Sequence, residues 1–123
     1  MMSSGFLNRS IGHKIGWWIL VLVAGASVVN HISGPLVGFA EGDAEVLMFF
    51  GLAAMNIYAV VVLLTGYLRG ERWAWWVTWV LVGLYALVIL YAPDAGPYYL
   101  GASGVMAVAQ LLAWKGFPRL GPA

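Results

Sequence analysis

Residues 45–91 decide the fold, because they place two long apolar segments on either side of a short charged turn. They read EVLMFFGLAAMNIYAVVVLLTGYL, then RGER, then WAWWVTWVLVGLYALVILY. A helix needs about 20 mostly apolar residues to cross the roughly 30 Å of hydrocarbon in a bilayer. Within the turn, Gly70 suits the left-handed conformation that ends many helices. The stretch therefore predicts a hairpin of two membrane-spanning helices, at about residues 45–68 and 73–91.

Two further apolar segments flank this hairpin. One begins at Ile15 and extends through Asn30 and His31 to about Ser33, and the other covers about residues 98–114. Lipid offers the backbone no hydrogen-bond partner, and four spans are too few to close a membrane barrel. We therefore predict an all-α integral membrane four-helix bundle, a single transmembrane domain over residues 1–123. Its predicted spans lie at about 15–33, 45–68, 73–91 and 98–114.

The segments between the spans also carry signals for turns and loops. Residues 93–97, with a proline at each end, are expected to stop the third helix and start the fourth, and Pro97 fits a first helical position. Residues 34–42 are predicted to form an apolar first loop that lies in the membrane interface or covers the bundle. The first span has a second reading as a cleaved signal peptide, because Ala24-Gly25-Ala26 follows a basic start and an apolar run.

Composition supports the membrane class and excludes several functions. Hydrophobic residues make up 63% of the chain and charged residues 9%, whereas soluble domains carry about 25% charged residues. The net charge of +1 gives no electrostatic basis for binding nucleic acid. The chain has no cysteine, so a disulfide, a thiolate nucleophile and a Cys-based metal site are excluded.

Charge also predicts the orientation. All six Lys and Arg residues fall on one side of the predicted spans, and four of the five acidic residues fall on the other. Because short cytoplasmic segments are enriched in Lys and Arg, both termini and the residue 69–72 turn are expected in the cytoplasm. This N-in, C-in arrangement predicts a multi-pass protein of a cell membrane, taken to be a bacterial inner membrane.

Polar residues within the spans suggest where a ligand would bind. No Asp, Glu, Lys or Arg lies deep in a span, which argues against an ion-coupled pump. Asn56 lies near the centre of the second span and should face another helix, with Gln110, Thr78 or Tyr58 as expected partners. An interhelical contact of this kind contributes about 0.6 kcal/mol on average. Structural support and ligand contact both remain open for Asn56 and Gln110.

A second polar group is expected near the outer end of the bundle. Its members are predicted at similar depth and are Asn30, His31, Glu45 and Tyr98. His31 is expected to pack near Glu45 or near the Tyr98-Tyr99 end of the fourth helix, roofed by residues 36–39. A histidine beside carboxylates can titrate near neutral pH or bind a metal, whereas an interfacial histidine needs no ligand. With Asn56 and Gln110, these residues form the predicted ligand-binding set.

Several kinds of chemistry have no support in the sequence. His13 and His31 lie on one segment, 18 residues or about 27 Å of helix apart, and cannot bracket one haem. Neither a phosphate-binding glycine loop nor a zinc-binding histidine pair is present. We therefore predict no catalytic residue, no metal and no cofactor.

The layout resembles the DoxX-like group of small four-span bacterial membrane proteins. The shared features are Asn30-His31 closing the first span, Glu45 opening the second, and Leu64-Thr65-Gly66-Tyr67 before a basic turn. The resemblance covers nearly the whole chain. It implies the four-span architecture and no particular activity, because functions within that group differ.

Three functions are compatible with these features. The leading prediction is a non-catalytic bundle in the lipid bilayer that binds a partner membrane subunit or a lipophilic small molecule, as a monomer or a homo-oligomer. The second is a carrier or channel for an uncharged solute, which Asn56 and Gln110 would line. The third is a small membrane enzyme or accessory subunit that uses His31 and Glu45.

Overall fold

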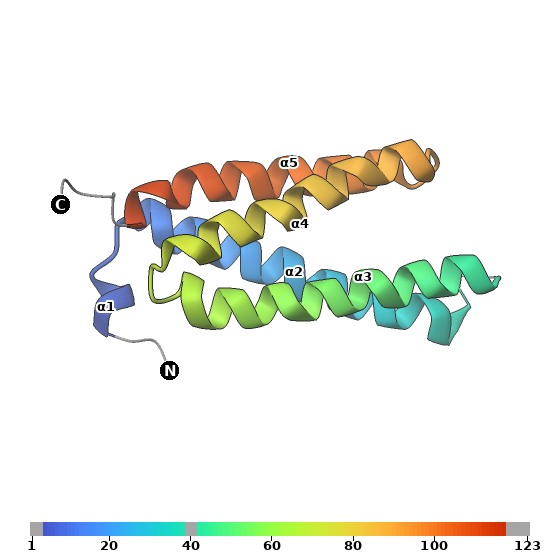
Figure 1. The fold of residues 1–123 in the computed structure, drawn as a ribbon, viewed down its shortest axis with the longest axis horizontal. Helices are drawn as coiled ribbons and strands as arrows, with labels where there is room; N and C mark the ends of the chain where they lie inside the picture. Colours follow the sequence, from blue (N-terminus) through green and yellow to red (C-terminus); the bar gives the residue numbers. More distant parts are fainter. Residues whose placement is uncertain (1–3, 39–41, 118–123) are drawn as a thin grey trace.

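The computed structural model describes residues 4–38 and 42–117, and every regular element in these ranges is helical (Figure 1). In chain order the elements are α1 (Ser4–Leu7), α2 (Ile11–Val37), α3 (Asp43–Val62), the π-helical turn η1 (Leu63–Tyr67), α4 (Arg72–Tyr91), α5 (Gly96–Ala113) and the 3-10 turn η2 (Trp114–Gly116). The all-α prediction is confirmed for the described residues.

Among residues 4–38 and 42–117, three helical stretches are long and apolar enough to cross a membrane. They are α2, α3 together with η1, and α4. The chain therefore has the helices of a multi-pass membrane protein. Helix α5 lies where the fourth span was predicted, but its 18 residues include Pro97, Ser103 and Gln110, and it is not among these three. A fourth crossing stays a prediction.

The helices form two pairs, α2 with α3 and α4 with α5 (Figure 1). Helix α5 also packs closely on α2, whereas α3 meets α4 only along a thin seam. We call the end that carries α1, the 69–72 turn and η2 the proximal end, and the opposite end the distal end. Figure 1 shows the α4–α5 pair separating from α3 toward the distal end.

Two glycines on α2 set its close approach to α5. A Cβ added at Gly12 would lie 2.5 Å from the Leu112 carbonyl oxygen, and one at Gly16 would clash with the Ala109 carbonyl oxygen. Small residues four apart let membrane helices approach through their backbones. The Gly12-Gly16 spacing is therefore visible in the sequence as a signal for close helix packing.

Helix α2 is longer than predicted at its distal end. It continues through Pro35 to Val37 and ends on Gly38, whose φ of 83° is left-handed. The loop predicted to begin at residue 34 therefore begins four residues later. Pro35 has no N–H to bond to the His31 carbonyl. Membrane helices tolerate proline because neighbouring groups and local backbone adjustments satisfy the freed carbonyl.

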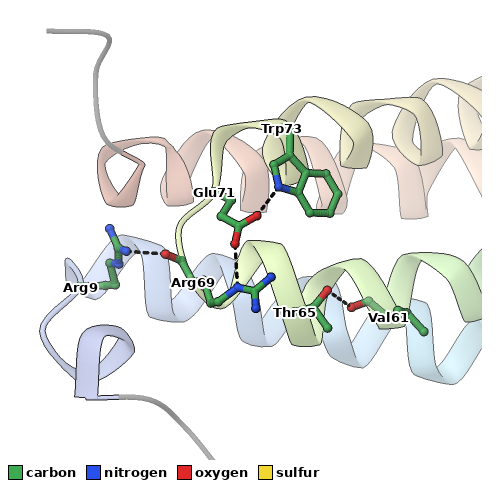
Figure 2. Close-up of polar contacts among 6 residues, drawn as sticks. All are labelled: Arg9, Val61, Thr65, Arg69, Glu71 and Trp73. Carbon is green, nitrogen blue, oxygen red and sulfur yellow. Dashed lines mark hydrogen bonds and ion pairs between the residues drawn. The ribbon is translucent and has the colours of Figure 1, made fainter.

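The proximal end is held together by Arg9, which follows α1. Its guanidinium donates to the Gly116 carbonyl at 2.7 Å and to the Arg69 carbonyl at 2.6 Å. Figure 2 shows the second of these bonds beside the 2.7 Å ion pair between Arg69 and Glu71. Gly70 has a φ of 75°, as predicted for this turn, and any Cβ there would clash with the Arg9 guanidinium. We call these contacts of Arg9 the proximal clasp.

Candidate functional site

His31 lies on the inner face of α2 and is fully enclosed. Its Nδ1 lies 2.7 Å from the Ser27 carbonyl oxygen, and its Nε2 lies 2.5 Å from the Tyr99 hydroxyl of α5. A carbonyl can only accept, so Nδ1 carries the proton in the neutral ring and Nε2 accepts from Tyr99. Both ring nitrogens are therefore occupied, and the predicted packing of His31 near the Tyr98-Tyr99 end of the fourth helix is confirmed.

Asn56 lies in the middle of α3, and its side chain is also enclosed. Its Nδ2 donates to the Leu52 carbonyl at 2.8 Å and to the Tyr85 hydroxyl of α4 at 2.7 Å. Among the described residues its Oδ1 has no hydrogen-bond partner. The amide therefore faces another helix, as predicted, but the partner is Tyr85.

The expected partners of Asn56 were wrong for separate reasons. Tyr58 points outward with 75% of its surface exposed, and the Thr78 hydroxyl bonds back to the Ala74 carbonyl on its own helix. Gln110 is occupied by a network nearer the proximal end. The sequence analysis did not name Tyr85 as a partner, although the hydroxyl of a buried tyrosine needs one.

Aromatic contacts join these two hydrogen-bonded pairs across the bundle. The Tyr85 ring lies edge-on to Tyr99 with centroids 5.3 Å apart, and His31 stacks on Tyr99 at 5.7 Å. The four residues His31, Tyr99, Tyr85 and Asn56 come one from each long helix. We call this group the polar row.

The other predicted site residues do not join the polar row. Asn30 points away from the core, and 67% of Tyr98 is exposed. Glu45 is exposed in the first turn of α3. The predicted roof is wrong for Leu36 and Val37, which are largely exposed, and Phe39 lies outside the described residues. Within residues 4–38 and 42–117, no three His, Asp or Glu side chains cluster as metal ligands would.

Gln110 belongs to a second network, in which its side-chain oxygen and its side-chain nitrogen each have a partner. Its Oε1 accepts from the Tyr67 hydroxyl at 2.7 Å, and its Nε2 donates to the Trp75 carbonyl at 2.9 Å. The Trp75 indole in turn donates to the Gln110 carbonyl at 3.0 Å. The π-helical turn η1, which contains Tyr67, is tied to α2 by a 2.7 Å bond from the Trp17 indole to the Leu63 carbonyl. Gln110 is therefore used to hold helices together.

Two apolar grooves lie along the seam between α3 and α4. The distal groove has a volume of about 520 Å³ and is lined by Met48, Gly51, Leu52, Met55, Leu84, Leu87, Val88, Tyr91 and Ala92. The proximal groove is smaller, at about 140 Å³, and lies between residues 55–62 and 77–81. Met55 borders both grooves, so they meet beside Asn56.

A third groove lies between α2 and α5. It has a volume of about 570 Å³, and its walls include Ala26, Ser27, Gly101 and Ala102. Ser27 and His31 are one helical turn apart, so this groove and the distal groove flank the polar row from opposite sides. The hydrogen-bonded polar row therefore lies between the distal groove and the α2–α5 groove, both of which open to the surface of the bundle.

Comparisons with family models, curated proteins and solved structures gave no match. The resemblance to the DoxX-like group therefore stays a prediction.

Proposed function

We propose that this chain is a non-catalytic four-span membrane protein that binds one lipophilic small molecule in the distal groove between α3 and α4. The observation that carries the proposal is the groove itself. Its roughly 520 Å³ lies within the range of about 300–1,000 Å³ that small-molecule sites occupy. Its lining is almost wholly apolar, and one lining residue, Leu52, accepts a hydrogen bond from the Asn56 amide at its carbonyl.

The four-span part of the proposal rests on the packing and charge of the helices. Helix α5 packs against both α2 and α4, which are long enough to cross a membrane. Lys14, Arg69, Arg72 and Lys115 lie near the proximal ends of their elements, and Asp43 and Asp94 near the distal ends. The positive-inside rule therefore supports a cytoplasmic proximal end in a bacterial inner membrane.

The alternatives have weaker support. A carrier for an uncharged solute would use Asn56 and Gln110 along one path, but they belong to separate buried networks. An enzyme would need His31 to reach a substrate, but the ring is buried and its Nε2 is hydrogen-bonded to Tyr99 inside the bundle. The polar row thus favours a binding role over transport or catalysis.

The test is a substitution that fills the distal groove without disturbing the helix packing. A Cβ at Gly51 or at Gly83 meets nothing within 4 Å, but only Gly51 lines the groove. We expect one lipophilic species to co-purify with the wild type. The Gly51→Leu protein should retain at least about tenfold less of it. Gly83→Leu should retain the wild-type amount, measured by mass spectrometry of lipid extracts.

Equal ligand content in the Gly51→Leu and Gly83→Leu proteins would contradict the proposed site. Gly101→Leu makes the same change in the groove between α2 and α5. Loss of the co-purified species from that variant instead of Gly51→Leu would move the site to the α2–α5 groove.

A further inference from the structure

We propose that the molecule in the distal groove carries a hydrogen-bond donor, a hydroxyl on an otherwise apolar body, which it gives to Asn56 Oδ1. This inference rests on the proposed function and narrows it to lipophilic alcohols. The inference rests on the buried Asn56 Oδ1, an acceptor that has no hydrogen-bond donor in the described part of the chain.

Every donor of the Asn56 amide is in use. An amide NH₂ has two protons, and here one goes to the Leu52 carbonyl and the other to the Tyr85 hydroxyl oxygen. Only the oxygen remains, with both lone pairs free. The amide therefore offers a ligand an acceptor and has no donor to give.

The orientation of the amide is set by its neighbour. Amide nitrogen and oxygen can often be exchanged without changing the fit of a side chain. Here an exchange would bring Oδ1 against the Leu52 carbonyl, so two acceptors would face each other. The nitrogen must stay beside Leu52, and the free group must be the oxygen.

The position of Asn56 makes this free oxygen costly. The continuous helix of α3 and η1 runs from residue 43 to 67, and Asn56 lies near its middle. A spanning helix places this position deep in hydrocarbon, where water rarely supplies the missing bond. Buried polar groups are nearly always hydrogen-bonded, so an unsatisfied one deserves a specific explanation.

The distal groove comes near this oxygen, although Asn56 is buried and is not one of the residues that line the groove. Leu52 and Met55 line the groove. Leu52 lies one helical turn before Asn56, and Met55 is its neighbour in the chain. Met55 also borders the proximal groove. Methionine is unbranched and flexible, so a shift of its side chain can open the groove floor toward Oδ1. Between Met48 and Asn56 the helix is about 12 Å long, which sets the scale of the apolar body.

The need of Asn56 Oδ1 for a hydrogen-bond donor separates the classes of ligand that can bind. An alcohol or a quinol can donate to Oδ1, whereas a quinone, an ether or an ester without a hydroxyl presents acceptors alone. Two facing acceptors leave the amide oxygen unsatisfied, and discrimination by an unpaired buried polar group is stronger than discrimination by a missing methylene. The site should therefore reject the acceptor-only form of a ligand of the same size.

The test compares 1-dodecanol with dodecyl methyl ether on the full chain in lipid nanodiscs. The two probes share an oxygen and an alkyl chain and differ in the O–H donor. Calorimetric titration should give a Kd for the alcohol at least about tenfold lower than for the ether. Gly51→Leu should weaken both probes, and Asn56→Leu should make their Kd values equal.

The possible outcomes separate this inference from the proposed function. Equal Kd values on the wild type, both weakened by Gly51→Leu, would overturn the donor requirement and support the groove. If neither 1-dodecanol nor dodecyl methyl ether binds the wild type, both proposals are contradicted. If Asn56→Leu folds and still prefers the alcohol, the assignment to Asn56 is wrong. The wild-type and Gly51→Leu titrations decide the donor requirement even if Asn56→Leu does not fold.

Discussion

At the residue scale, the two amides Asn56 and Gln110 differ in how completely they are bonded. Gln110 has a partner at both side-chain polar atoms, from Tyr67 and from the Trp75 backbone. Asn56 has partners only at its nitrogen. The sequence allowed Gln110, beside Thr78 and Tyr58, as a partner of Asn56, because it reveals depth only coarsely. Their real partners are buried tyrosines, one for each amide.

The Gln110 network can be tested by removing one hydroxyl. Tyr67→Phe leaves Gln110 Oε1 without its donor in an enclosed site, so it should lower the free energy of unfolding by about 1 kcal/mol. Tyr58→Phe is the matched control, because that side chain is 75% exposed. Thermal unfolding in detergent should show a lower Tm for Tyr67→Phe alone. Equal Tm values would mean that this hydrogen bond contributes nothing measurable.

At the element scale, the packing of α2 on α5 depends on which glycines face inward. Gly25, Gly101 and Gly104 are as small as any residue in these helices, yet a Cβ at any of them meets nothing within 4 Å. Gly12 and Gly16 make the close contact instead. Apolar residues cover both the packed and the lipid-facing sides of these helices, so hydrophobicity does not reveal which glycine faces which side.

Gly16→Val should therefore destabilise the bundle, because the added side chain must displace the α5 backbone at Ala109. Overpacking of this kind costs about 1–3 kcal/mol. Gly25→Val makes the same change on the same helix in open space and should leave Tm close to the wild type. A Gly16→Val protein as stable as Gly25→Val would show that α2 and α5 are farther apart than the structure places them.

How much could be predicted at this scale depends on local chemistry. The 69–72 turn and the start of α5 near Pro97 were predictable, since Gly70 and Pro97 each have one favoured backbone role. The π-helical turn at residues 63–67 was not, because its residues suit an ordinary α-helix equally well. The end of α2 was predicted about four residues too early, because Pro35 suggested a loop. The sequence does not show that the helix continues through this proline to Val37.

At the scale of the whole molecule, four helical segments and their approximate ends followed from hydropathy, and their pairing did not. The sequence placed His31 and Tyr99 at the same depth, and the structure brings them into contact. It could not show that α3 separates from α4 toward the distal end, because the grooves there are lined by ordinary apolar residues. The candidate site was therefore predictable at His31, Tyr99 and Asn56, and not at Tyr85 or in its groove.

The orientation of the molecule is tested by reporter fusions. Since the proximal ends of the helices carry the basic residues, a reporter active only in the cytoplasm should work when fused after Ala123. The same reporter fused after Gly42, which begins α3 at the distal end, should be inactive. A periplasm-specific reporter should give the opposite pattern. Activity of the cytoplasmic reporter at Gly42 would contradict the N-in, C-in orientation.

The proximal clasp has a consequence for the timing of biosynthesis. Arg9 is made early, but the carbonyls it binds belong to residues 60 and 107 positions later in the chain. At translation rates of roughly 5–20 residues per second, the second acceptor is synthesised about 5–20 s after Arg9. During that interval the Arg69 carbonyl is the one acceptor of the clasp that Arg9 can reach, and it is made about 3–12 s after Arg9. The contact that closes this end forms last, and a ribosome that stops before Gly116 leaves it open.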